Sequence, residues 1–181
     1  AWGGAHGEQF TITESPAVDV RSVVLTIVLA VLCAAVSILF CMVLHHTEHW
    51  YQKWIPNEWV RIISGALLVI LMTILLGTTD YLGAGMDVVA KAVAGETAAA
   101  AFLIKMVFTA VTLGSGFKGG EIVPTLFVGA TFGCLFGQVT GLAPSLAAAC
   151  GMAAVFCGVT NCPISSLLLS FELFGFQCMP F

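Results

Sequence analysis

Charged residues are scarce in this 181-residue chain. Asp, Glu, Lys and Arg make up 9% of it, with a net charge of −4, whereas an average soluble domain carries about 25% charged residues. Residues 122–171 contain no charged residue and no histidine. A surface helix of a soluble protein needs a polar face, so the composition excludes a soluble fold and predicts an all-α, polytopic membrane protein. Nothing in the charge balance indicates nucleic acid as a partner.

Features of a complete terminus are also missing. The first residues, AWGGAHGEQF, include no initiator Met, no basic region and no apolar core of a targeting peptide. The other end, GFQCMPF, has no polar tail. We therefore expect a fragment of a longer protein, truncated at both ends. Residues 1–181 are then one partial transmembrane domain, with a loop over 1–17 and membrane helices over 18–181.

Motifs for catalysis and metal binding are lacking. The seven cysteines form no C-x-x-C pair, and their odd number in apolar segments indicates reduced thiols that act as small apolar residues. GSGFKGG lacks the Gly-Lys-Ser/Thr ending of a phosphate-binding loop, and no nucleophile–base pair is visible. His45 and His49 are four residues apart, but without a suitably spaced third ligand they predict an interfacial belt rather than a metal site. We expect no enzyme, no cofactor and no metal.

Several apolar segments have the length of membrane helices. Residues 22–44 form a run of 23 residues without a charge, long enough to cross a bilayer at about 1.5 Å per residue. Lys53 and Arg61 are expected in the loop after this span. Further helices are expected over residues 62–77, 87–94, 97–113, 146–157 and 164–174. Glycine and proline separate the last of these, which is typical of broken helices in transporters.

Two features inside the apolar segments call for a structural explanation. Lys105 lies near the middle of the helix expected over 97–113, where a buried lysine is costly. Either it has a partner or a function, or it reaches the membrane surface or a wet cleft; the sequence leaves both open. Gly129, Gly133 and Gly137 form a GxxxGxxxG pattern, which predicts a face for close helix packing.

The segment 113–130, LGSGFKGGEIVPTLFVGA, interrupts the apolar sequence with glycines, a lysine and a glutamate. Its glycines predict a tight loop, and Pro124 suits the first turn of a following helix. The free N–H groups and the dipole at that helix start would bind an anion. Lys118 is expected on the wet side of the loop.

With these motifs in place, the chain resembles the CLC family of anion channels and proton-coupled anion antiporters. GSGFKGGEIVP followed by TLFVGATFG is similar to the family loop whose following helix points at the permeant anion. Two further segments are similar to family segments: TDYLGAG, before this loop, and GVTNCPISSLLLSFELFG, after it. The three motifs follow one another in the same order as in the family. The resemblance covers most of the chain but less than half of a family protomer, mainly its second inverted repeat. The family's gating glutamate and its pathway tyrosine would lie outside these residues.

Glu121 refines the resemblance, because GGE-x-x-P looks like the bacterial fluoride-exporting branch of the family. This implies fluoride/proton antiport in the full-length protein, with Glu121 in proton transfer or gating. The alternative for Glu121 is a first-turn carboxylate that only complements the helix dipole. Anion binding is implied for Gly120, Glu121, Ile122 and Val123, and for Phe102 through its ring edge. Val123 departs from this branch, whose members often carry a hydroxyl residue there; Thr125 offers a hydroxyl nearby.

The resemblance also implies the partners of the full-length protein. These are fluoride or chloride, protons, the lipid bilayer of a bacterial inner (plasma) membrane and a second copy in a homodimer. A chloride channel or chloride/proton antiporter is the first alternative. A membrane scaffold without transport activity, suggested by the GxxxGxxxG face, is the second.

Overall fold

The computed structural model describes residues 20–78, 81–98 and 100–174, and these residues form seven helices and no strand. The prediction of an all-α fold is therefore confirmed, while the loop expected over residues 1–17 lies outside the described residues. The helices are α1 (Val20–Trp54), α2 (Glu58–Leu76), α3 (Met86–Val93), α4 (Ala101–Gly114), α5 (Ile122–Thr140), α6 (Pro144–Thr160) and α7 (Pro163–Phe174).

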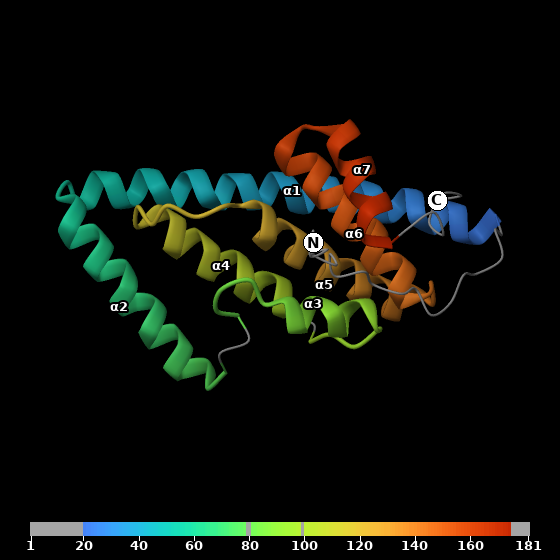
Figure 1. Ribbon diagram of the computed structural model, residues 1–181, viewed down its shortest axis with the longest axis horizontal. Helices are drawn as coiled ribbons and strands as arrows, with labels where there is room; N and C mark the ends of the chain where they lie inside the picture. The colour runs from blue at the N-terminus through green and yellow to red at the C-terminus, as the bar shows by residue number, and fades with distance from the viewer. Residues whose placement is uncertain (1–19, 79–80, 99, 175–181) are drawn as a thin grey trace, which may run out of the picture.

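The helices are arranged along α1, which runs the length of the molecule (Figure 1). At the end of α1 the chain turns and α2 leads away from it at an angle. Helices α4, α5 and α6 all pack against α1. The most extensive interface is that between α5 and α6; α3 contacts both of these helices, and α7 contacts α6.

Three helices, α1, α2 and α5, have the length and apolar composition to cross a membrane. Helix α1 has 35 residues, which correspond to about 52 Å at 1.5 Å per residue and exceed a hydrocarbon core of about 30 Å. It continues without a break through the histidines and tryptophans after residue 44. The placement of Lys53 and Arg61 in a loop was wrong, because Lys53 lies in the last turn of α1 and Arg61 in the first turns of α2. Only residues 55–57 connect the two helices.

Other predicted boundaries also differ from the structure, and α2 begins at Glu58 rather than at residue 62. Helix α4 begins at Ala101 rather than at residue 97; the amide of Ala101 donates to the carbonyl of Ala98 at 3.0 Å, three residues earlier rather than the four of an α-helix. Helix α6 extends from Pro144 to Thr160 and is longer than the segment 146–157. Pro144 can begin it because a proline in the first turn loses no helical hydrogen bond.

The predicted glycine face is the contact between α5 and α6. A Cβ atom at Gly129 would lie 2.5 Å from the carbonyl oxygen of Gly151, and one at Gly137 would lie 2.8 Å from Cα of Pro144. At Gly133 a Cβ would overlap the carbonyl group of Ala147. The two backbones are in direct contact along this face, so the prediction of close packing is confirmed.

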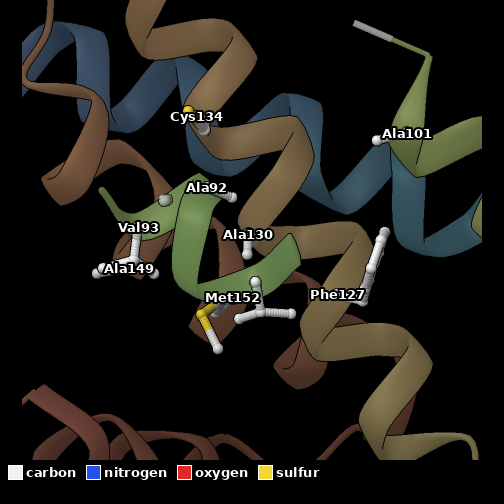
Figure 2. Close-up of a cluster of buried hydrophobic side chains, with 10 residues drawn as sticks. Ala92, Val93, Ala101, Phe127, Ala130, Cys134, Ala149 and Met152 are labelled. Atoms are coloured by element: carbon white, nitrogen blue, oxygen red, sulfur yellow. The ribbon is translucent and has the colours of Figure 1, made fainter. Parts of the chain in front are cut away.

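Two clusters of buried apolar side chains hold the helices together. In the first, Ala92 and Val93 of α3 pack with Ala130 of α5 and Ala149 of α6 (Figure 2). The second cluster joins α1, α4, α5 and α6. Cys33 and Cys134 are fully buried members of the two clusters and serve there as small apolar residues, as predicted.

Lys105 is buried, with 2% of its surface exposed. Its ammonium group donates hydrogen bonds to the carbonyls of Tyr81 at 3.0 Å and Gly83 at 2.6 Å, and it lies 4.9 Å from the ring centre of Phe127. The reading in which Lys105 reaches the membrane surface is therefore wrong. The lysine has partners, and it ties the segment before α3 to α4 and α5.

Candidate functional site

The glycine loop is fixed between α1 and α2 where it leaves α4. Gly114 packs on α1, where a Cβ atom would lie 2.8 Å from Cγ2 of Thr47. Ser115 is completely buried and occupies the space that Gly65 of α2 leaves free. The first residues of the loop thus have a defined position, and the segment from 116 to 121 continues from there along α1 (Figure 1).

Gly116 is the one loop residue with a left-handed backbone, at φ = 93°, and the guanidinium group of Arg61 lies against it. We expect Gly116→Ala to strain the loop by about 1–2 kcal/mol and to push Arg61 away, since a Cβ would lie 3.2 Å from its Nη2. The thermal transition of the detergent-solubilised protein should fall, as measured by fluorescence-detected size-exclusion chromatography.

Gly120→Ala is the matched control, because a Cβ at Gly120 meets no atom within 4 Å and its φ lies outside the left-handed region. Equal transition temperatures for the two variants would contradict this account of Gly116.

Helix α5 begins directly after Glu121 and presents its first amides at the end of the loop. Pro124 lies in the first turn, as predicted, and the amide of Thr125 bonds to the carbonyl of Glu121 at 3.0 Å. The N–H groups of Ile122 and Val123 precede this first helical bond and have no acceptor within the helix. Ile122 is 52% and Val123 36% exposed, and the space beside Gly120 is open. An anion can therefore approach this helix start.

The hydroxyl of Thr125 does not contribute to that surface. Thr125 is fully buried, and its hydroxyl is 2.7 Å from the carbonyl oxygen of Glu121 and 2.6 Å from that of Ile122. It is thus engaged with its own helix. In the first turn of α5 the donors available to an anion are backbone amides.

Glu121 lines a pocket of about 240 Å³ between the loop and α1. From α1 the pocket receives Cys41, Leu44, His45 and Glu48, which are spaced i, i+3, i+4 and i+7 and so share one face of the helix. The proximity of His45 and Glu48 to Glu121 was not predicted from the sequence. The spacing of His45 and Glu48 in the sequence indicates that they share a face of one helix. It does not indicate which segment of the chain packs against that face.

Phe102 is not among the residues that line the pocket of Glu121. It is half-buried in the first turn of α4, where its ring contacts that of Phe132 edge-on, with centroids 5.4 Å apart. Phe132 lies ten residues into α5, about 15 Å from the helix start at 1.5 Å per residue. The role of Phe102 in anion binding stays a prediction. Lys118 is exposed on the loop, as expected.

Within residues 20–78, 81–98 and 100–174, no three His, Cys, Asp or Glu side chains are grouped closely enough to hold a metal ion. His45 and His49 both line a larger hollow on α1, together with His46.

A model of the family described as "Voltage gated chloride channel" matches residues 2–181. The chain belongs to this family. Among curated CLC relatives, the "Chloride/fluoride channel protein" of Pseudomonas syringae pv. tomato is 31% identical over 99% of this chain and 41% of its own length. The "Voltage-gated ClC-type chloride channel ClcB" of Escherichia coli is 32% identical over 90% of this chain and 40% of its own.

A solved CLC structure has the same arrangement of helices. The crystal structure of a CLC-type fluoride/proton antiporter superposes with a TM-score of 0.89 at 28% identity, covering 95% of this chain and 44% of that one. The chain thus spans about two fifths of the length of these relatives. It is part of a multi-pass membrane protein fold, as the spanning helices α1, α2 and α5 also indicate.

Proposed function

We propose that residues 1–181 are a partial transmembrane domain of a longer CLC protein that exports fluoride in exchange for protons. The observation that carries this proposal is the position of Glu121. It precedes the free amides of Ile122 and Val123 at the start of α5, and it lines the pocket that also contains His45 and Glu48. An anion site and a proton-binding carboxylate are thus adjacent.

The amides and the carboxylate have different roles in this proposal. Fluoride is small and strongly hydrated, so its site must replace water by good donors. The amides of Ile122 and Val123 and the dipole of α5 provide these, and Gly120 leaves the approach open. An ionised Glu121 beside a bound anion is unfavourable, which favours uptake of a proton by the carboxylate. Binding of fluoride and protonation of Glu121 are coupled in this way.

The name of one relative and the fold of one solved structure support this proposal. One relative is named for chloride and fluoride, and a CLC-type fluoride/proton antiporter shares the helix arrangement of this chain. We extend the proposal to a homodimer in a bacterial inner membrane, with Phe102 contributing a ring edge to the anion pathway.

Transport by the full-length protein in liposomes tests the proposal. We expect fluoride efflux with proton uptake for the wild type, and Glu121→Gln to abolish the proton uptake and to slow fluoride efflux at least about tenfold, a barrier increase of about 1.4 kcal/mol. Glu172→Gln, at an exposed position of α7, is the control and should transport normally. Fluoride/proton exchange unchanged by Glu121→Gln would reduce Glu121 to a residue that complements the helix dipole.

Chloride transport is a second candidate, favoured by the absence of a side-chain donor in the first turn of α5. Val123 has no hydroxyl, and that of Thr125 is bonded to backbone carbonyls. Several relatives are named chloride channels. In the same liposomes, chloride flux indifferent to Glu121→Gln would favour this candidate. No flux of either anion would favour the non-transporting scaffold.

A further inference from the structure

Two hollows adjoin α1 near the glycine loop, and the same two residues line both. The smaller is the pocket of Glu121, with a volume of about 240 Å³. The larger is about 860 Å³ and extends over α1 from Ser37 to His49 and to Gly158 at the end of α6. Cys41 and His45 line both hollows. The two hollows are therefore neighbours on this part of α1.

The groups around Glu121 that can carry a charge come from three elements. Helix α1 contributes Cys41, His45 and Glu48 to the pocket, while α4 contributes only Leu113 and Gly114. Helix α2 places the guanidinium group of Arg61 against Gly116, further back in the loop. Lys118 is exposed on the loop itself. Of these groups, only the imidazole of His45 both adjoins the two hollows and ordinarily changes charge between about pH 5 and 8.

We propose that His45 is the proton-exchange partner of Glu121, a role that rests on the function proposed above. The imidazolium form of His45 gives one proton, through water in the smaller pocket, to the carboxylate of Glu121. The carboxylate becomes a neutral carboxylic acid and the imidazole becomes neutral. Water in the larger hollow then returns a proton to the imidazole, so that one proton has passed from the larger hollow to Glu121.

The surroundings of His45 fit this role. A pocket of about 240 Å³ has room for several water molecules, each of which occupies about 30 Å³ in the liquid. Glu48 lies three residues after His45 on the same helix, and neighbours at this spacing interact across the helix surface. Both side chains line the pocket of Glu121.

The test compares His45→Gln with His46→Gln in the full-length protein in liposomes. His46 lines the larger hollow but is not part of the lining of the Glu121 pocket, so it is a control with identical chemistry. Fluoride efflux and proton uptake are recorded from pH 5.5 to 8. We expect His45→Gln to lose at least tenfold in coupled flux and to lose the pH dependence between pH 6 and 7.5. Imidazole in the buffer should restore part of the flux, and His46→Gln should behave as the wild type.

The outcomes separate this inference from the proposed function. Coupled exchange in the wild type that His45→Gln leaves unchanged in rate and pH profile would overturn the proton-exchange role alone. Absence of proton uptake in the wild type would overturn the proposed function and this role with it. If His45→Gln does not fold, His45→Asn decides: the role requires the same loss of coupled flux, and a flux and pH profile identical to those of the wild type would overturn the role.

Discussion

Replacing Gly133 by leucine is expected to prevent stable folding of the α5–α6 pair. At this position even a Cβ atom overlaps the carbonyl group of Ala147 on α6. The obstacle is backbone rather than a flexible side chain, so the helices can accommodate the leucine only by separating along their whole interface. Overpacking in a tight core costs about 1–3 kcal/mol and occasionally more; we expect at least about 3 kcal/mol here. The measurement is the thermal transition in detergent, together with the yield of monodisperse protein.

Val139→Leu on the same helix is the control for this prediction. Val139 is 78% exposed, so a larger side chain meets no packed neighbour and the transition should not change. A Gly133→Leu protein as stable as Val139→Leu would contradict the close contact between α5 and α6.

Replacing Lys105 by methionine is expected to destabilise the junction of α3, α4 and α5 by about 2 kcal/mol. Methionine keeps the length of the side chain but removes the donor to the carbonyls of Tyr81 and Gly83. A hydrogen bond to a charged group contributes about 1.5–3 kcal/mol, and the contact with the ring of Phe127 is lost as well. Protease cleavage at the segment before α3 should become faster, and the thermal transition should fall.

Lys91→Met provides the comparison, because Lys91 is exposed in the last turn of α3. It removes the same charge from an exposed side chain, whereas Lys105 is buried and bonded to two carbonyls. If both variants lose equal stability, the effect comes from net charge and not from the partners of Lys105.

Local signals in the sequence were sufficient to predict that the helices exist, although not all of their ends, and to predict the helix start at the glycine loop. The uncharged run over 122–171 indicated the membrane, Pro124 marked the first turn of α5, and the GxxxGxxxG pattern indicated a packing face. Each of these depends on residues that are close in sequence, where helix geometry fixes which side chains share a face.

Signals from residues that are close in sequence could not predict the neighbours of Glu121 or the partners of Lys105. His45 is 76 positions before Glu121 in the sequence, and only the packing of α4 on α1 brings the loop to it. The acceptors of Lys105 are backbone carbonyls, which any residue type supplies, so no sequence pattern identifies them. Phe102 was assigned by resemblance. The structure places its ring against that of Phe132, and its role in the anion pathway stays a prediction.

The contact between Gly129 and Gly151 has a consequence for how such a protein can evolve. A Cβ atom on Gly129 would meet the carbonyl of Gly151, and a Cβ atom on Gly151 would meet the carbonyl of Gly129. A side chain gained at either position therefore has to be accommodated by movement of the opposite helix, which also carries the neighbouring contacts of Gly133 and Gly137. Single substitutions along this interface are thus disfavoured even when the new side chain is as small as that of alanine. Descendants of this sequence can enlarge one of these residues only together with compensating changes across both helices.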